Sequence, residues 1–144
     1  MNKISEFQGE YRFLSNFYRS AVNINGYSFY TAEAAYQACK TDSNTNKRHL
    51  SSIICPVEAK RFGRNMKPIV SDWNQIKDSY MYSVVLNKFS QNVDIKNKLI
   101  ATENAILEEG NAWNDTYWGI CPPNSNIGRN RLGIILMEVR LVLS

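Results

Sequence analysis

Two segments of this 144-residue chain carry side chains whose types and spacing suit chemistry. In the first, Glu33, Gln37 and Lys40 lie at i, i+4 and i+7, with Tyr36 alongside. At about 100° per residue, the first three project from one side of a helix. A carboxylate beside an amine suits a general acid or base next to a nucleophile, each altering the pKa of the other. The same spacing also suits the solvated face of an ordinary helix, and the pattern leaves both interpretations open.

The second segment, Glu109–Gly119, combines a turn signal with the carboxylate of Asp115 and two tryptophans, Trp113 and Trp118. Tryptophan is costly to leave in water, and a polar turn is a poor place to bury two of them. Either the indoles form the walls of a pocket that has Asp115 as its chemical group, or they cap the core before a strand. This segment alone favours neither.

Three further segments have residues that could bind a ligand. Lys60, Arg61 and Arg64 near a helix end suit a phosphate, but they suit the helix dipole equally well. Gly128–Gly133 at a helix start could present backbone amides to an anion, although it lacks the spacing of a dinucleotide fingerprint. The aromatic segment Phe13–Tyr18 is predicted to be a strand edge in preference to a ligand loop.

Composition predicts one soluble domain spanning residues 1–144, with 44% hydrophobic and 21% charged residues. The net charge of +4 fits anionic partners only weakly. Three cysteines without C-x-x-C spacing indicate neither a disulfide framework nor a zinc site, and a single histidine, His49, argues against a His-based triad or metal centre. We expect no metal and no cofactor. With no signal-peptide core or membrane span, a cytoplasmic location is expected.

The elements that must position these residues follow from turn and capping signals. Asn25-Gly26 is a strong two-residue hairpin signal. Thr31, Pro56 and Ser71 are predicted to begin helices, and Gly63 to end the second of them. Strands are expected at Ala21–Ile24 and Tyr27–Tyr30. Helices are expected from Thr31 to about Thr41, near Lys47–Ile54, at Val57–Phe62 and from Ser71 to about Phe89. The last helix has an apolar stripe formed by Trp73, Ile76, Tyr80, Val84 and Phe89.

In the second half of the chain, a helix is expected after Asn92. Short strands are expected at Ala105–Glu108 and Thr116–Ile120, on either side of a turn. A C-terminal helix is predicted around residues 132–139, where apolar residues recur at i, i+3, i+4 and i+7. The sum is an α+β fold, a predominantly helical single domain with a small β-hairpin or sheet.

Taken together, these segments resemble one family, the NADAR (YbiA-like) family. Any one segment is a weak signal, but their order along nearly the whole chain is specific. The matching blocks are Phe13–Tyr18, Thr31–Lys40, Glu58–Arg64, Trp73, Lys88-Phe89, Glu109–Gly119, Gly128–Gly133 and Ile135–Arg140.

The resemblance implies an N-glycosidase-type hydrolase that cleaves the bond between a base or amine and ribose phosphate or ADP-ribose. Its substrates would be riboflavin-pathway intermediates or ADP-ribosylated guanine in nucleic acid. By the same resemblance, Glu33, Lys40 and Asp115 would be catalytic, and Asn16, Phe17, Trp73, Trp118 and Asn130 would shape the substrate site. Arg64 is expected to hold the phosphate of the substrate through its guanidinium. The alternative is a non-catalytic module that binds ADP-ribose or nucleic acid.

Two mechanisms suit these residues. Glu33 and Asp115 could divide the work of stabilising the sugar cation or activating water and of protonating the leaving base. Alternatively, a neutral Lys40 attacks the sugar and holds it as a Schiff base, which requires a lysine pKa lowered by desolvation. Ala34 and Asn114 depart from the His and Gly frequent in the family, and both positions bear on substrate choice.

Overall fold

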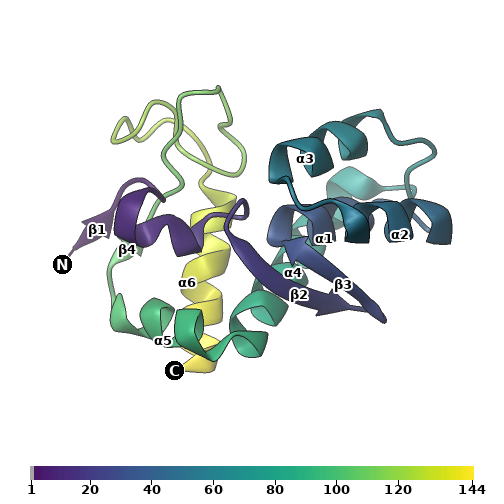
Figure 1. Ribbon diagram of the computed structural model, residues 1–144. Coiled ribbons are helices and arrows are strands. Elements are labelled where there is room, and N and C mark those ends of the chain that lie inside the picture. Colours follow the sequence, from purple (N-terminus) through teal and green to yellow (C-terminus); the bar gives the residue numbers. More distant parts are fainter. Residues whose placement is uncertain (1) are drawn as a thin grey trace. The chain divides into compact units, whose positions relative to one another are not determined.

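The computed structural model describes residues 2–144, whose contacts divide into two compact units (Figure 1). The central unit comprises Asn16–Asn92. The terminal unit comprises the described residues before Asn16 together with Val93–Ser144. Helices predominate in both units, which confirms the predicted α+β class.

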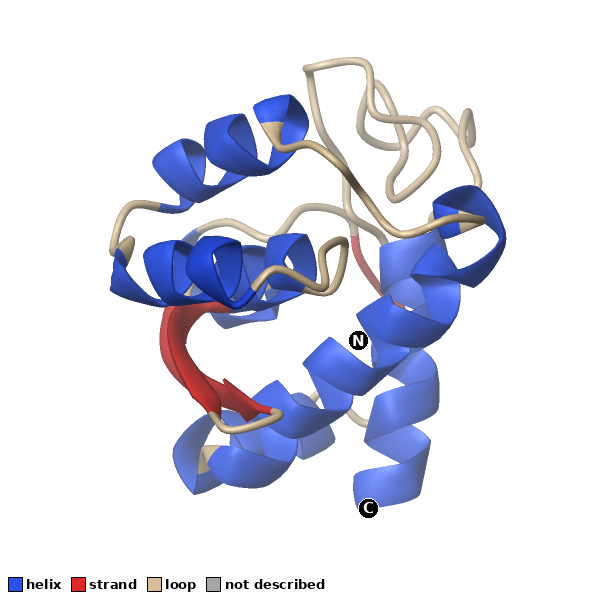
Figure 2. Ribbon diagram, turned by 90° about the vertical axis from the view of Figure 1, so that its right-hand side faces the viewer, coloured by secondary structure: helices blue, strands red, loops and turns tan. Residues whose placement is uncertain are grey.

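The central unit begins with a two-stranded antiparallel hairpin, drawn in red in Figure 2. Strand β2 (Arg19–Ile24) pairs with β3 (Tyr27–Thr31). Asn25 and Gly26 have φ angles of 53° and 85°, and two consecutive positive angles are what the tightest hairpin turn requires. The predicted hairpin is therefore confirmed.

Four helices complete the central unit, and α1 is the one around which the others pack. It contacts both hairpin strands and each of the other three helices. All seven of its residues are buried, including a glutamate and a glutamine. The helices are α1 (Ala32–Ala38), α2 (Asn44–Ser52), α3 (Pro56–Asn65) and α4 (Trp73–Gln91).

Several predicted helix boundaries are wrong, each for a local reason. Helix α2 begins at Asn44, three residues before the predicted start, because Ser43 caps it with a hydroxyl that accepts a hydrogen bond from the amide of Asn46. Gly63 lies inside α3 instead of ending it. Ser71 does not cap α4: Asp72 precedes the helix in the left-handed conformation and makes no side-chain cap.

The predicted apolar stripe of α4 is only partly correct. Trp73, Val84 and Phe89 are buried, whereas Tyr80 is 39% exposed and Ile76 is half-buried. The face of α4 that is buried also includes Met81, Val85 and Lys88.

The terminal unit contains a two-stranded parallel sheet, in which β1 (Lys3–Ile4) pairs with β4 (Ile106–Leu107). A 3₁₀ helix, η1 (Gly9–Leu14), follows β1. The unit is completed by α5 (Val93–Ala101) and by α6 (Arg131–Leu143), whose buried residues confirm the predicted C-terminal pattern. Within residues 2–144, no helix is both long and apolar enough to cross a membrane.

Two strand predictions in this part of the chain are wrong. Phe13–Tyr18 is not a strand edge, since its first two residues belong to η1 and the next residues form a turn before β2. Residues 116–120 do not form a strand opposite β4, which pairs with the N-terminal strand instead. Apart from one isolated bridge between Gly110 and Ile120, this segment uses its carbonyls to bind the start of α6.

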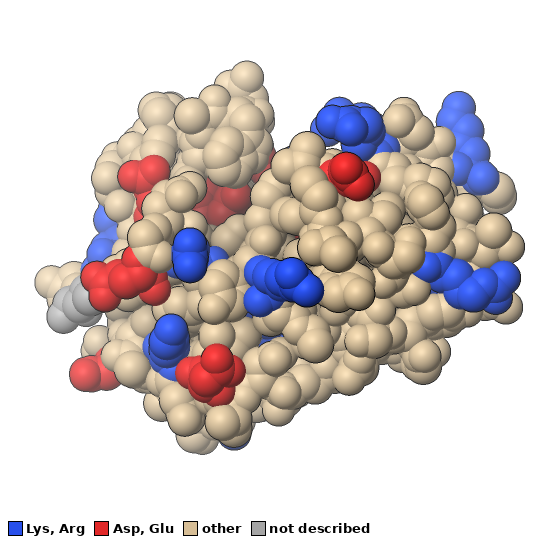
Figure 3. Space-filling view, viewed as in Figure 1, with Lys and Arg blue, Asp and Glu red and all other residues tan. Residues whose placement is uncertain are grey.

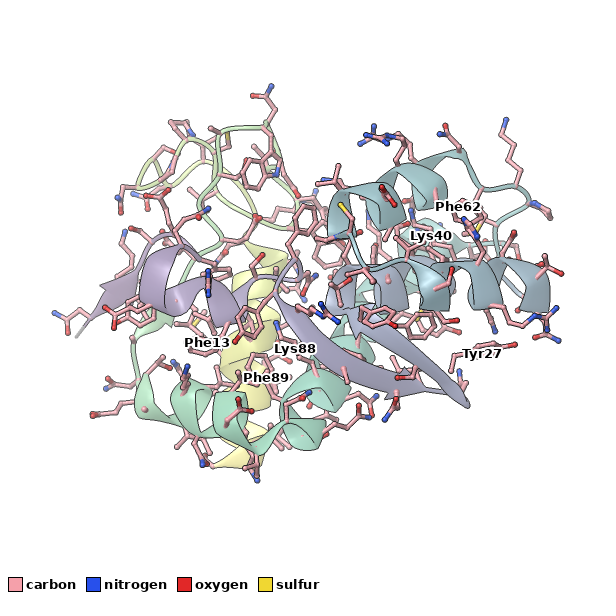
Figure 4. All side chains as sticks on the ribbon, viewed as in Figure 1. Phe13, Tyr27, Lys40, Phe62, Lys88 and Phe89 are labelled. Carbon is pink, nitrogen blue, oxygen red and sulfur yellow. The ribbon has the colours of Figure 1, made fainter. Side chains whose placement is uncertain are left out.

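A lysine lies in the core of the protein. Lys88 on α4 is 0% exposed, and its ammonium lies 5.0 Å from the ring centre of Phe89 and 5.8 Å from that of Tyr18 (Figure 4). Desolvation lowers the pKa of Lys88 from 10.5 to about 7. The unfolded chain therefore binds this proton more tightly than the folded protein does, so protonation destabilises the fold.

We expect Lys88→Met to remove a pH-dependent cost. The cost is absent above about pH 10.5, grows as the pH falls and is fully present below about pH 7. At pH 7 the variant should be more stable than wild type by on the order of 4 kcal/mol, with a smaller difference at pH 10. Chemical denaturation across this pH range measures both values. Lys67→Met, at an exposed position, is the control, and equal pH slopes in the two variants would contradict the expectation.

Candidate functional site

The start of α1 is fixed by its N-cap and by one backbone hydrogen bond. The hydroxyl of Thr31 accepts a hydrogen bond from the amide of Ala34 at 3.1 Å. The amide of Glu33 donates to the backbone carbonyl of Asn16 at 3.0 Å. The side-chain amide of Asn16 is buried and lies 3.3 Å from the sulfur of Met81. Asn16 is thus held against α1 at the position of Glu33.

Glu33 and Gln37 form a buried polar pair on α1. Their side chains are 8% and 4% exposed, and Nε2 of Gln37 donates to Oε2 of Glu33 at 2.6 Å. A buried carboxylate is costly unless it accepts hydrogen bonds, and Gln37 supplies one. Oε1 of Gln37 is buried and accepts no hydrogen bond from any described residue. The side of the helix that carries Glu33 and Gln37 is therefore part of the core, and the interpretation as a solvated face is wrong for these two residues.

Gly63 explains how α3 can pack this closely against α1. A β-carbon at Gly63 would overlap the side chain of Gln37, from its Cγ to its Oε1. Only glycine leaves the room in which Gln37 reaches Glu33. This long-range contact is the physical reason for a glycine in the middle of a helix, where it is otherwise unfavourable.

Lys40 lies two residues after the end of α1 and is half-buried (Figure 4). Desolvation lowers the pKa of Lys40. The negative charge of Glu33 opposes this shift, and the positive charges of Arg64, Lys77 and Lys60 add to it. The direction is the one that a lysine nucleophile requires, because more of the amine is then neutral near physiological pH.

Aromatic rings lie beside Lys40. Its ammonium is 5.9 Å from the ring centre of Tyr36, which lies 5.4 Å from the ring of Trp73. Trp73 is stacked on Tyr80 at 5.8 Å and is 9% exposed, so it packs between two tyrosines. Its predicted role in stacking on a ligand stays a prediction.

Two other predicted ligand residues of the central unit are more accessible. Phe17 is 39% exposed, and the ammonium of Lys60 lies 6.0 Å from its ring centre. Arg64 is exposed in the last turn of α3, and its charge acts on Lys40. The central unit thus contains six of the nine predicted residues, with Asn16 bonded to Glu33 and with Glu33 and Arg64 electrostatically coupled to Lys40.

The other three, Asp115, Trp118 and Asn130, belong to the terminal unit and lie in the long segment between β4 and α6. Asn111, which the sequence did not single out, organises this segment. It is 2% exposed; its Oδ1 accepts from the amides of Trp113 and Asp115, and its Nδ2 donates to the carbonyl of Asp115 at 2.9 Å. Its only signal in the sequence is its place after the turn glycine.

Asp115 is half-buried and closes the next turn. Its Oδ1 accepts hydrogen bonds from the amides of Tyr117 at 3.1 Å and Trp118 at 2.9 Å. Its Oδ2 accepts no hydrogen bond from the described residues, so this carboxylate oxygen is available to contact a ligand. The indole of Trp118 is half-buried and meets Tyr117 edge to face, whereas Trp113 is 56% exposed and does not cap the core.

The backbone at the start of α6 is hydrogen-bonded to the segment that carries Trp118. The amides of residues 129–132 donate to carbonyls of residues 116–119 at 2.8–3.3 Å. The anion site suggested by the sequence of Gly128–Gly133 is therefore wrong, because these amides are already used. Asn130 has a φ of 51°, and its side chain bonds the amide of Glu109 and the carbonyl of Leu107. Its predicted contact with substrate stays a prediction beside this structural role.

Comparison with known proteins places the chain among relatives of one kind. The NADAR domain model matches residues 4–144. The chain is 33% identical over 132 residues to N-glycosidase YbiA of Escherichia coli, which is 91% of this chain and 81% of that protein. It is 34% identical over 134 residues to an N-glycosidase of Nostoc punctiforme, covering 90% and 84% of the two chains.

Two more matches extend this result. A riboflavin biosynthesis protein of Vibrio vulnificus is 33% identical over 129 residues, which is 89% of this chain and 34% of that protein. The NMR structure of E. coli YbiA matches with a TM-score of 0.84 and 31% identity, covering 98% of this chain and 83% of that one. The chain therefore belongs to the NADAR family. Its named relatives support a hydrolase of N-glycosyl compounds.

The contact between Gly63 and Gln37 makes a testable prediction. Gly63→Ala should push Gln37 away from Glu33, lower stability by about 1–3 kcal/mol and reduce turnover. In a Gln37→Ala background the same change should be neutral or stabilising, because the space is free and alanine favours a helix. A double-mutant cycle measured by chemical denaturation checks this, and additive effects of the two substitutions would contradict it.

Two variants separate the structural role of Asp115, which accepts hydrogen bonds in the turn, from the role of its negative charge. Asp115→Asn keeps an oxygen that accepts the amides of Tyr117 and Trp118, whereas Asp115→Ala removes it. We expect the Asn variant to melt near wild type and the Ala variant to lose about 1 kcal/mol. If the carboxylate is catalytic, the Asn variant should still lose at least about 100-fold in turnover. Wild-type turnover in the Asn variant would restrict Asp115 to holding the turn.

Proposed function

We propose that this protein is an N-glycosidase that hydrolyses the bond between a base or amine and the ribose of a ribose phosphate or of ADP-ribose. The observation that carries the proposal is Lys40, a half-buried amine whose pKa is lowered by desolvation and which is electrostatically coupled to the buried carboxylate of Glu33. Cleavage of such a bond leaves positive charge on the sugar and negative charge on the base. An amine that attacks the sugar and an acid that protonates the base meet these two needs.

The proposed reaction uses Lys40 as nucleophile. Its neutral amine bonds to the anomeric carbon while the bond to the base breaks, and the base leaves with a proton from the carboxylic acid of Glu33. The resulting carboxylate takes a proton from the new ammonium and passes it to the ring oxygen as the ring opens, which leaves a protonated imine. Water adds to the imine carbon, and departure of the amine frees the sugar and restores Lys40.

The pair of Gln37 and Glu33 supports this role. Gln37 fixes one oxygen of the carboxylate at 2.6 Å, so the acid keeps one orientation as it gives and accepts protons. Arg64, exposed at the end of α3, suits the phosphate of the substrate as a guanidinium that can make two parallel hydrogen bonds. Asp115 remains the candidate second carboxylate, which its asparagine variant tests.

The substrate is assigned only to the class of ribosyl N-glycosides. Riboflavin-pathway intermediates and ADP-ribosylated guanine in nucleic acid share the bond that the proposed reaction breaks. Incubating the protein with each, followed by mass spectrometry of the released sugar, identifies which one it uses. Binding of either ligand with no sugar released from both would favour a non-catalytic binding module instead.

Lys40→Ala and Lys40→Arg should each lower turnover at least about 100-fold, because neither side chain supplies the nucleophilic amine. The melting temperature should change little, because partial burial of the Lys40 ammonium does not stabilise the fold. In wild type, turnover should rise with pH as the amine loses its proton and fall again as Glu33 loses the proton that it gives to the base, because the proposed reaction needs a neutral amine and a protonated acid together. Borohydride should trap a sugar on wild type and not on Lys40→Ala. Lys98→Ala is the control, at an exposed position on α5. Wild-type turnover in Lys40→Ala would refute the Schiff base.

A further inference from the structure

A cavity lies against the side of α1 that faces away from Glu33. Counted at about 100° per residue, Ala35, Ala38 and Cys39 project roughly opposite to the side that carries Glu33. These three residues line a cavity of about 170 Å³, which the hairpin, α2 and α4 also bound. None of the nine residues predicted for catalysis or substrate binding, all of which the structure describes, lines it. The cavity is therefore separate from the proposed catalytic residues.

The interior of the cavity is apolar and has aromatic walls. Phe29 and the two alanines are buried, and Tyr27 and Tyr80 also line the cavity. The hydroxyl of Tyr27 donates to Oδ1 of Asn44 on α2 at 2.9 Å, and Tyr80 is stacked on Trp73 at 5.8 Å, so both rings are held in place (Figure 4). A cavity of about 150 Å³ accommodates a benzene ring, so this one has room for a six-membered aromatic ring. Walls that are already formed lower the cost of binding it.

Two side chains of opposite charge line the same cavity. Asp42 is exposed and Lys47 is half-buried. Ser43 is the N-cap of α2, so Asp42 occupies the position before the cap and Lys47 the fourth position of the helix. In the hydrophobic staple, residues at these two positions pack against each other, so the two side chains start from neighbouring places. Among the described residues, neither forms an ion pair with the other or with a third residue.

The carboxylate of Asp42 is unpaired in a part of the protein that is rich in cations. Residues 16–92 contain ten Lys and Arg and five Asp and Glu. Basic side chains also predominate over the central unit on the face that Figure 3 shows. Asp42 is thus available to a cationic group of a ligand, and Lys47 to an anionic group. An aromatic interior with one charge of each sign beside it defines the chemistry of the ligand.

We propose that this cavity binds a small zwitterion with an aromatic ring, of the class of the free aromatic amino acids. The ring occupies the apolar interior, the ammonium group contacts Asp42 and the carboxylate contacts Lys47. A neutral aromatic molecule would leave both charges unused, and an aliphatic amino acid would leave the interior unfilled. The inference goes beyond the proposed N-glycosidase activity, because it requires neither an N-glycoside nor turnover.

An NMR titration of the isotope-labelled protein with L-phenylalanine, the smallest common member of this class, tests the proposal. Phenethylamine lacks the carboxylate and phenylpropionate lacks the ammonium group. Each should bind at least about tenfold more weakly than phenylalanine, because a hydrogen bond to a charged group is lost. L-Alanine lacks the ring and should not bind at up to about 10 mM. If phenylalanine itself does not bind at up to about 10 mM, the proposal is overturned.

Variants of the protein locate the binding. Asp42→Asn should weaken phenylalanine binding at least about tenfold and leave phenylpropionate binding unchanged, because only phenylalanine has the ammonium group that Asp42 contacts. Asp94→Asn, at an exposed position in the first turn of α5, is the matched control and changes the net charge equally. Ala38→Leu should abolish binding by filling the cavity, and its melting temperature shows whether it is folded. Equal affinity of Asp42→Asn and Asp94→Asn for phenylalanine would overturn the proposal, whatever the state of Ala38→Leu.

The thiol of Cys39 reports whether the ligand lies inside the cavity. Burial raises the pKa of this thiol to about 11, against the opposing charge of Lys47, so its alkylation is slow. Bound phenylalanine should slow the alkylation of Cys39 further and leave that of the exposed Cys55 unchanged, as measured by mass spectrometry of peptides. Binding that leaves Cys39 unprotected would place the ligand elsewhere and overturn the proposal. Because no readout involves turnover, failure of the N-glycosidase proposal would leave these results unchanged.

Discussion

The constraint on which the central unit depends is the burial of a carboxylate in the middle of its core. Glu33 lies on a helix whose seven residues are all buried, and a carboxylate there is unfavourable unless it is hydrogen-bonded. Gln37 meets part of this need from the next turn of the helix. The other residues of α1 are alanines and one tyrosine, so neighbouring helices can approach closely, and α3 does so at a glycine.

The same packing sets the state of Lys40. Desolvation favours its neutral form and Glu33 favours the charged one, while three cations on α3 and α4 act with desolvation. The balance therefore depends on α3 being held against α1, which places Arg64 and Lys60 where their charges reach the amine. One contact between helices thus serves both the orientation of the acid and the protonation of the amine.

Local patterns predicted some of this architecture well. Asn25-Gly26 specified the hairpin, and Thr31 specified the start of α1, because turn type and N-cap depend on a few neighbouring residues. Residues 116–120 resembled a strand, but their carbonyls bind the amides of α6, a partner more than ten residues away. Gly63 resembled a helix end for the same kind of reason. Its function lies in a contact with Gln37, 26 residues earlier.

The site residues also divide into those that local sequence patterns predicted and those that they did not. Spacing and composition singled out Glu33, Lys40 and Asp115 as residues that could do chemistry, whereas the family resemblance was needed to single out Asn130. In the terminal unit, Asn111 and Asn130 use their side chains to bond backbone groups that strands or helices would otherwise satisfy. A segment held in this way can present Asp115 and Trp118 from an irregular backbone. Such asparagines resemble ordinary loop residues in a sequence, and only their burial and their partners identify what they hold.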